Sequence, residues 1–280
     1  MLKNQTVAFL GAGSMAEAMI AGIVESEKLP REQVIVTNRS NEERLQEMRN
    51  KYGIRAMKKE ELFFEEIDMF ILAMKPKDAE KALASIKDDI RPDQTVLSVL
   101  AGISTPFMEE NLKYGQQVIR VMPNTSSMIG ESATAISPGR HVGMDKVMMA
   151  KELLQAIGQV YIMDEEKMDI FTGIAGSGPA YFYHLMEHIE RTGMEAGLEP
   201  EQAREIGAQT ILGAAKMMIE REETPSQLRE NVTSPNGTTA AGLDALAKHG
   251  GGEAIGEAIK GAAKRSKELS EQLERKYATV

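Results

Sequence analysis

The turn Gly11-Ala12-Gly13-Ser14-Met15-Ala16 decides the fold of this chain. An apolar run of strand length at residues 6–10 precedes it, and residues 15–24 continue with apolar side chains at helical spacing. Gly11 permits a tight turn, Gly13 lets the backbone approach a pyrophosphate, and the small Ala16 lets the helix pack closely on the strand. The N-terminus of that helix offers N–H groups and a partial positive charge. The sequence therefore predicts a dinucleotide-binding unit, and the simpler alternative is a strand-to-helix turn that binds nothing.

The composition indicates a soluble globular protein and excludes several kinds of site. Hydrophobic residues make up 42% of the 280 residues and charged residues 27%, which is typical of a folded domain in water. The formal net charge of −9 disfavours a nucleic-acid or anionic-membrane partner. The lack of cysteine excludes disulfides, thiol nucleophiles and Cys-ligated metals. We expect a cytoplasmic protein, because the sequence has neither a membrane-spanning apolar run nor the pattern of a signal peptide.

Strands alternate with helices through the first half of the chain. The expected strands are residues 6–10, 33–37, 53–57, 67–73, 95–99, 117–121, 133–137 and 159–162. The expected helices between them are residues 15–24, 42–51, 77–89, 105–112 and 145–157. This alternation predicts an α/β fold with a Rossmann-type, doubly wound and mostly parallel sheet, and it leaves open an antiparallel pairing of the last strands.

The character of the sequence changes near Asp164, where β-branched runs give way to Ala, Glu, Met, Leu and Lys. The expected helices beyond it are residues 179–196, 201–221, 225–232, a segment from the loop at 233–237 to about 248, and 253–276. The chain is therefore divided into a dinucleotide-binding domain, 1–163, and an all-α domain, 164–280. The first two of these helices carry apolar residues on more than one face. We expect contact between subunits to cover them, and a monomeric bundle is the alternative.

The end of the second strand favours NADP(H) over NAD(H). A fold that prefers NAD usually has Asp or Glu there to bind the ribose 2′-hydroxyl. This chain has Asn38, Arg39 and Ser40 instead, which can donate hydrogen bonds to a 2′-phosphate. NADP(H) is therefore the expected cofactor, with NAD(H) left open. The alternative is a loop arginine that contacts only solvent.

Three further turns follow predicted strands at the edge where open α/β sheets bind ligands. They are Ala73-Met74-Lys75-Pro76, Ala101-Gly102 and Val121-Met122-Pro123-Asn124-Thr125. Lys75 can face a phosphate or a ribose, and Ala101 is small enough for the backbone to lie near the nicotinamide. Each turn alone is better explained as an ordinary connection, but together they predict a cleft.

Two turns in the second half are typical of anion sites. They are Ala175-Gly176-Ser177-Gly178-Pro179 and Thr233-Ser234-Pro235-Asn236-Gly237-Thr238-Thr239. Each has a flexible backbone and hydroxyl groups directly before a helix, whose N–H groups can bind a carboxylate. An ordinary helix cap is the alternative for both.

One metal-binding pattern is present by spacing. His184, Glu187 and His188 match the spacing of some zinc peptidases, with two histidines on one helix face. No Gly-rich or acidic partner helix accompanies them, and a packed helix face explains the pattern equally well. We therefore expect no metal site.

These features together resemble the Δ1-pyrroline-5-carboxylate reductase family along nearly the whole chain. The most specific stretch is residues 229–243, in combination with Gly176-Ser177-Gly178-Pro179-Ala180-Tyr181. The resemblance implies reduction of L-1-pyrroline-5-carboxylate to L-proline by hydride transfer from NAD(P)H. It also implies a homodimer, or a multiple of dimers, built through the helical domain.

The resemblance further implies which residues form the two sites. The implied cofactor site comprises Gly11, Ala12, Gly13, Ser14, Met15, Asn38, Ser40, Ala73, Met74, Lys75, Pro76 and Ala101, to which we add Leu10 and Arg39. The implied substrate site comprises Glu165, Asn231, Thr238 and Thr239, to which we add Ser234 and Gly237. We expect the substrate carboxylate on the N–H groups of Gly237 and Thr238. The catalytic hydroxyl of Thr239 then bonds the ring nitrogen, orients it and relays a proton.

The chain departs from the family pattern at three positions. Glu60 stands where the family often has Asn beside the 2′-phosphate, so Arg39 must dominate there. Asn236 and Thr238 replace the commoner Gly and Ala, which leaves the backbone role of that loop intact.

Two other functions stay open at this point. One is a two-domain reductase of the β-hydroxyacid dehydrogenase type, which places a catalytic lysine in the first long helix after the sheet domain. Residues 179–192 contain no lysine. The other is a non-catalytic NADP-sensing protein on the same fold, which is disfavoured because every expected type of site residue is present.

Overall fold

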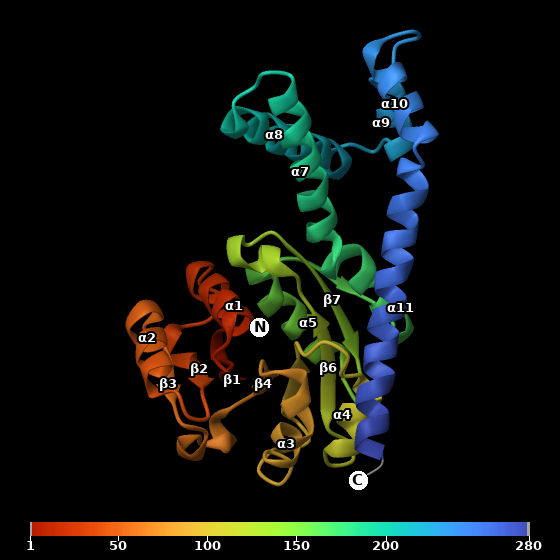
Figure 1. The fold of residues 1–280 in the computed structure, drawn as a ribbon. Helices are drawn as coiled ribbons and strands as arrows, with labels where there is room; N and C mark the ends of the chain where they lie inside the picture. The colour runs from red at the N-terminus through yellow and green to blue at the C-terminus, as the bar shows by residue number, and fades with distance from the viewer. Residues whose placement is uncertain (1, 279–280) are drawn as a thin grey trace. The chain divides into compact units, whose positions relative to one another are not determined.

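The chain folds into two compact units (Figure 1). The computed structural model describes the backbone of residues 2–278 and the side chains of residues 2–273. The first unit comprises Met1–Ser177 with Gly261–Val280, and the second comprises Gly178–Lys260. This division follows contacts between residues, whereas the boundary at 163/164 is drawn from composition and stays a prediction. Within the described residues, no helix is both long and apolar enough to cross a membrane.

An eight-stranded sheet forms the centre of the first unit. Its strands are β1 Val7–Leu10, β2 Val34–Thr37, β3 Arg55–Met57, β4 Met69–Leu72, β5 Thr95–Ser98, β6 Gln117–Met122, β7 Ser132–Pro138 and β8 Gly158–Ile162. They lie in the order β3-β2-β1-β4-β5-β6-β7-β8, and neighbours are parallel except for β6 and β7. The predicted Rossmann-type sheet is confirmed, and one of the last strand pairs is antiparallel. The strand order reverses between β1 and β4, which is the kind of switch point where such sheets bind ligands.

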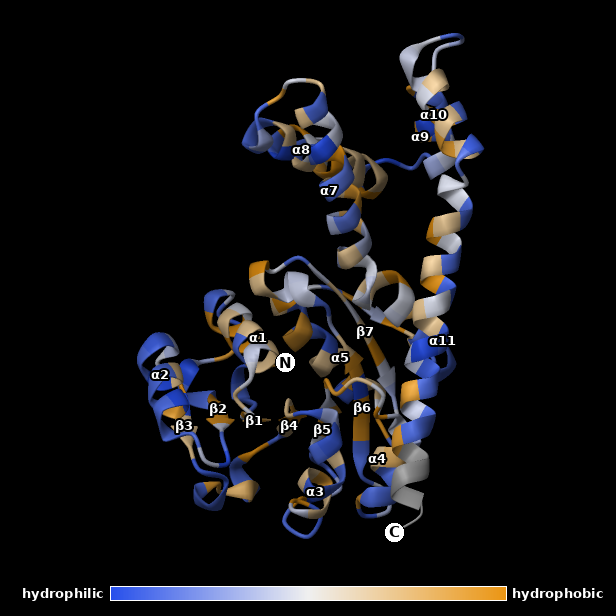
Figure 2. Ribbon diagram, in the orientation of Figure 1, coloured by the Kyte–Doolittle hydropathy of each residue, from blue (hydrophilic) through white to orange (hydrophobic). Residues whose placement is uncertain are grey.

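Helices cover both faces of the sheet, because its central strands are apolar at consecutive positions. In β1, Val7 and Phe9 point into one core, whereas Ala8 and Leu10 point into the other. Alternate side chains of a strand point to opposite faces, so a strand that is apolar throughout needs two cores. Figure 2 shows the resulting pattern, with apolar residues concentrated on the strands and hydrophilic residues on the outer helix α2.

The helices divide between the two cores. Those that pack into the core containing Phe9 are α1 Ser14–Glu25, α2 Glu42–Tyr52 and α5 Met144–Leu154. Those that pack into the other core are α3 Ala79–Ala84 and α4 Thr105–Asn111. Short 3₁₀ helices connect the elements: η1 Leu2–Asn4, η2 Arg31–Gln33, η3 Lys59–Glu61, η4 Phe64–Glu66, η5 Pro76–Asp78, η6 Thr125–Ile129, η7 Gln155–Ile157 and η8 Glu165–Lys167.

The second unit is helical, as predicted. Its helices are α7 Gly178–Glu195, α8 Pro200–Glu220, α9 Pro225–Asn231, α10 Thr238–Lys248 and the first part of α11 Gly251–Ala278. The helices α7 and α8 approach closely, since a Cβ on Gly207 would lie 2.7 Å from Met186 Cε. Arg204 Nε donates to Glu190 across the same pair at 2.9 Å. Large apolar side chains nevertheless stay exposed on both helices, among them Phe182, Leu185, Ile206, Leu212 and Met218.

Three segments differ from expectation. Residues 165–176 are helical, as η8, α6 Met168–Phe171 and a π-helical turn Thr172–Gly176, although the prediction begins the first helix at 179. Two glycines within this stretch lower its helix propensity and hide the signal. The helix expected at 77–89 is α-helical only to Ala84 and continues as turns. The helix α11 begins at Gly251, because the first positions of a helix tolerate glycine.

Candidate nucleotide and substrate sites

The conformation of Gly11 accounts for the first glycine of the turn. Its φ is +120°, which side chains disfavour, and a Cβ there would lie 2.6 Å from Ala73 O at the end of β4. Its N–H donates to Thr37 O at the end of β2, at 3.1 Å. The turn is therefore held between the carboxyl ends of β2 and β4.

Gly13 has a different reason to be glycine. Its φ is −75°, which any residue adopts, and a Cβ there would find Ala73 O only at an ordinary 3.8 Å. Neither strain nor packing within the chain thus requires glycine at this position, whereas close approach of a ligand does. Gly13 also precedes α1 without capping it by a side chain, so within the described residues the first N–H groups of α1 have no such partner. This arrangement fits a pyrophosphate.

The loop after β2 presents two of its three predicted donors to solvent. The side chain of Asn38 is used within the loop, where its Oδ1 accepts from the N–H groups of Ser40 and Asn41, each at 3.2 Å. Arg39 and Ser40 are exposed. This Asx turn fixes the loop through the Asn38 carbonyl oxygen and leaves the Arg39 guanidinium, the Ser40 hydroxyl and Asn38 Nδ2 as donors to a phosphate.

Sequence reasoning missed Lys58, which follows β3 beside that loop. Lys58 forms an ion pair with Glu42, which raises the pKa of Lys58 and lowers the pKa of Glu42. Glu60 lies in η3, two residues further on, and is exposed. Lys58 could have been found from the register of β2 and β3, which brings the ends of these strands together.

The remaining predicted cofactor residues lie at the same edge of the sheet. Ala73 N donates to Leu10 O at 3.0 Å, which joins the ends of β4 and β1. Met74 packs on the core, whereas Lys75 is exposed and precedes Pro76, the first residue of η5. Ala101, which follows β5, is exposed. The topology therefore brings the predicted cofactor residues to the carboxyl ends of β1, β2, β4 and β5, which we call the nucleotide edge.

The turn after β6 is tied to the π-helical turn of the same unit. Asn124 Nδ2 donates to Ala175 O at 3.0 Å, and its Oδ1 accepts from Ser126 N at 3.1 Å. A Cβ on Gly176 would lie 3.2 Å from Met122 Cε. These contacts hold residues 172–177 beside the carboxyl end of β6.

The loop before α10 is braced by its own residues. Thr233 Oγ1 donates to Arg229 O at 2.6 Å, and Gly237 N donates to Ser234 O at 3.0 Å. Asn236 adopts a left-handed conformation with φ +56°, which Asn tolerates better than most residues. Gly237 precedes α10 and provides no side-chain cap. The start of α10 therefore leaves the N–H of Thr238 for an anion, whereas the N–H of Gly237, the other predicted donor, is already bonded to Ser234 O.

The hydroxyls of Thr238 and Thr239 follow directly, at the first two positions of α10. Within the described residues neither hydroxyl has a hydrogen-bond partner. Asn231 is the last residue of α9 and is exposed. The predicted substrate residues between 231 and 239 thus lie together in the second unit.

Glu165 lies in the first unit, where its carboxylate is already engaged. Arg120 Nη1 donates to Glu165 Oε1 at 2.5 Å, and Thr105 Oγ1 donates to Glu165 Oε2 at 3.1 Å. The side chain of Arg120 is 5% exposed, in the middle of β6. Sequence reasoning missed Arg120, although a lone charge inside an apolar strand is the signal for a buried partner.

On α7, Glu187 Oε2 lies 3.5 Å from His184 Nδ1. His188 Nε2 lies 3.2 Å from His184 Nε2, and Arg191 contacts His188 Nδ1 at 2.6 Å. Within the described residues, no group of three or more His, Asp or Glu side chains could hold a metal ion. The neighbouring guanidinium further disfavours a bound cation.

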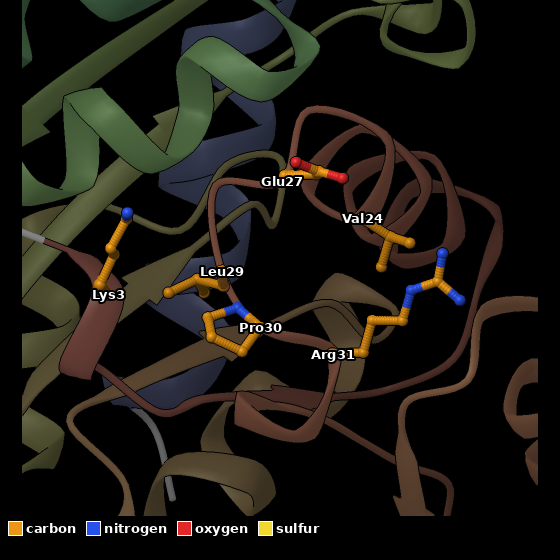
Figure 3. A pocket seen from close by; sticks show the side chains of 6 residues that line it. All are labelled: Lys3, Val24, Glu27, Leu29, Pro30 and Arg31. Atoms are coloured by element: carbon orange, nitrogen blue, oxygen red, sulfur yellow. The ribbon is translucent and has the colours of Figure 1, made fainter.

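A cavity of about 390 Å³ lies away from the nucleotide edge (Figure 3). It is lined by Lys3, Val24, Glu27, Leu29, Pro30 and Arg31. Lys3 precedes β1 and Arg31 precedes β2, so this cavity lies at the amino ends of the strands. It does not belong to the nucleotide turn.

Comparison with known proteins gives the family. Residues 165–269 match the family model described as pyrroline-5-carboxylate reductase dimerisation, and residues 6–102 match the model described as NADP oxidoreductase, coenzyme F420-dependent. The chain is 62% identical over 277 residues to pyrroline-5-carboxylate reductase 1 of Bacillus subtilis (strain 168), which covers 99% of this chain and 93% of that one.

Solved structures agree with these matches. A pyrroline-5-carboxylate reductase from Coxiella burnetii is similar with a TM-score of 0.88 and 30% identity, over 96% of this chain and 99% of that one. The Plasmodium falciparum pyrroline carboxylate reductase with NADP bound is similar with a TM-score of 0.85 and 26% identity, over 96% and 100%. With its nucleotide turn, its helical second unit and these relatives, the chain belongs to the pyrroline-5-carboxylate reductase family of oxidoreductases.

Proposed function

We propose that the chain reduces L-1-pyrroline-5-carboxylate to L-proline with hydride from NADPH. The observation that carries the proposal is the 62% identity to a pyrroline-5-carboxylate reductase over nearly the whole chain. A two-domain reductase of another type is disfavoured, since α7 has no lysine between 179 and 192. An NADP-sensing protein would bind the nucleotide without turnover.

We further propose that the chain prefers NADPH over NADH. The exposed guanidinium of Arg39 and the hydroxyl of Ser40 support this preference, because both can bind a 2′-phosphate. The negative charges of Glu42 and Glu60 oppose binding of a 2′-phosphate. Lys58 forms an ion pair with Glu42, and its positive charge offsets that of Glu42. Leu10, the turn 11–15, residues 73–76 and Ala101 are the proposed contacts to the rest of the nucleotide.

The substrate is proposed to bind at the start of α10. Its carboxylate accepts a hydrogen bond from the N–H group of Thr238, with Ser234 and Asn231 beside it, and the N–H of Gly237 joins only by leaving Ser234 O. A bound NADPH supplies the hydride, which the imine carbon of the substrate accepts while the ring nitrogen takes a proton. The Thr239 hydroxyl bonds that nitrogen, orients the ring and relays the proton. No covalent bond to the chain is needed, because alignment of two bound reactants supplies much of the rate.

The protein is proposed to work as a homodimer or a multiple of dimers in the cytoplasm. The exposed apolar side chains of α7 and α8 support self-association, as does the match to a dimerisation family. Analytical ultracentrifugation measures the mass, and a monomer at micromolar concentration would contradict this part of the proposal.

A direct assay tests the activity. The purified protein is incubated with NADPH and pyrroline-5-carboxylate, the absorbance of the reduced nicotinamide is followed, and the product is identified by chromatography. We expect loss of absorbance only when both reactants are present, with proline formed in equal amount. NADPH binding without oxidation would instead support the sensing protein.

A further inference from the structure

A cluster of charged side chains links α1 and α2 behind the nucleotide turn. Glu17, in the first turn of α1, accepts hydrogen bonds from three residues of α2. Lys51 Nζ and Tyr52 OH each donate at 2.8 Å, and Arg44 Nη2 forms an ion pair with the same carboxylate. The bonds from Arg44 and then Lys51 lower the pKa of Glu17 to about 2. The carboxylate is therefore ionised and held at neutral pH.

Arg44 makes a further bond that the other members of the cluster do not make. Its Nε donates to Ala12 O, inside the nucleotide turn, at 3.0 Å. Its Nη1 donates to Glu47 at 2.7 Å, and its Nη2 is used by Glu17. Each of the three guanidinium nitrogens is thus engaged, so the position of the Arg44 side chain is fixed by Ala12, Glu17 and Glu47.

The bond to Ala12 completes the set of contacts that fix the turn. Gly11 N is bonded to Thr37 O, and Gly13 O accepts from Glu17 N at 2.9 Å. Between them, the carbonyl of Ala12 is fixed by Arg44 alone among the described residues. The orientation of that carbonyl fixes the peptide that joins Ala12 to Gly13, whose N–H belongs to the phosphate-binding backbone.

The same residue controls a charge that would disfavour a phosphate. A carboxylate in the first turn of a helix competes with a bound anion for the positive end of the helix dipole. Arg44 and Lys51 neutralise Glu17 and hold it toward α2. The two effects of Arg44, on geometry and on charge, can be separated because Lys51 contributes to the second only.

We propose that Arg44 is a positioning residue for the dinucleotide, which fixes the Ala12–Gly13 peptide so that its N–H faces the pyrophosphate. This inference rests on the proposed function, because it assumes a dinucleotide at the turn. Since the guanidinium of Arg44 is engaged with Ala12, Glu17 and Glu47, we expect its loss to affect NADPH and NADH equally. It also leaves the binding of pyrroline-5-carboxylate unchanged.

The test compares Arg44→Ala, Arg44→Lys and the matched control Lys51→Ala in the full-length protein. Dissociation constants for NADPH and NADH are measured by nicotinamide fluorescence, and KM and kcat by the reductase assay. We expect Arg44→Ala to raise Kd and KM for both nucleotides by about tenfold or more, the loss expected for a charged hydrogen bond. We expect kcat at saturation and KM for pyrroline-5-carboxylate to change by less than about twofold. Lys51→Ala, which removes one positive partner of Glu17 but leaves Ala12 bonded, should stay within about threefold of wild type.

The conservative variant Arg44→Lys separates the geometry of Arg44 from its charge, and a folding control separates both from loss of structure. Arg44→Lys retains the charge but lacks the planar fork that reaches both Ala12 and Glu17, so Kd should stay raised by about fivefold or more. Recovery of wild-type affinity by Arg44→Lys, or an equal loss in Lys51→Ala, would contradict positioning. Circular dichroism reports folding, and Arg44→Lys alone decides if Arg44→Ala does not fold. Wild-type protein that binds neither nucleotide contradicts the proposed function, whereas Arg44 variants that bind normally contradict only this inference.

Discussion

Arg120 Nη1 lies 2.5 Å from Glu165 Oε1, and this bond joins the middle of β6 to the segment that follows β8. Arg120 is almost completely buried, and Thr105 adds a second hydrogen bond to the carboxylate. A charge in such a place is tolerated only with a partner, so removal of Glu165 leaves an uncompensated guanidinium.

Glu165→Gln should therefore lower the free energy of unfolding by about 3 kcal/mol, measured by urea denaturation. The matched control is Glu166→Gln, because Glu166 is exposed and adjacent. If Glu165 also binds the substrate, KM for pyrroline-5-carboxylate rises as well. A raised KM at unchanged stability would show that the Arg120–Glu165 bond does not stabilise the fold, and it would favour a contact between Glu165 and the substrate.

Arg39→Ala should change the cofactor preference. Loss of a charged donor to the 2′-phosphate is expected to raise Kd for NADPH about tenfold more than Kd for NADH. Arg31→Ala serves as control, since Arg31 is also exposed but lies at the amino ends of the strands. Equal losses for the two nucleotides in Arg39→Ala would mean that this guanidinium does not meet the phosphate.

Thr239→Ala should lower kcat/KM by about tenfold or more, the effect of one lost polar contact to the reacting nitrogen. Thr239→Ser keeps the hydroxyl and should recover most of the activity. Steady-state rates with NADPH held at saturation measure both variants. Full activity in Thr239→Ala would remove the proposed role of the hydroxyl.

Acid should weaken the contact between α1 and α2. The pKa of Glu17 is lowered from 4.5 to about 2, first by the bond from Arg44. A depressed carboxyl pKa stabilises the fold above the unfolded pKa, and this contribution is lost as pH falls from 4.5 toward about 2. The side chain is 22% exposed, so the contribution is at most about 3 kcal/mol.

Urea denaturation of the wild type and of Glu17→Gln, at neutral pH and at about pH 3, measures this contribution. We expect Glu17→Gln to be less stable at neutral pH and the difference to shrink in acid. A difference that is independent of pH would show that the ionisation of Glu17 does not stabilise the fold.

The doubly wound sheet could be predicted from the sequence, because strand and helix periodicities and the Gly11–Ala16 turn are local signals. Neighbouring residues alone determine them, so no knowledge of distant contacts is needed. The same holds for the long helices of the second unit. Local signals could not predict the helical stretch at 165–176, because its π-helical turn depends on tertiary contacts such as the bond from Asn124 Nδ2 to Ala175 O.

The nucleotide edge could be predicted in part. The residues that follow β1, β2, β4 and β5 were found from strand ends, but Lys58 and Arg44 were not. Only the register of β2 and β3 places Lys58 beside the loop that follows β2. Only the folded structure brings Arg44 of α2 to the carbonyl of Ala12, before α1. Charged residues on a helix are usually solvated, so their spacing along the sequence does not reveal such bonds.

The antiparallel pairing of β6 and β7 determines how the chain leaves the sheet. Because β7 and β8 run against the other strands, the chain departs from β8 in the direction opposite to the nucleotide edge. Residues 163–177 must return along β6, and the Arg120–Glu165 and Asn124–Ala175 bonds mark the two ends of that path. An insertion or deletion between 166 and 174 would therefore displace Ser177, where the first segment of the first unit ends, even with every strand intact.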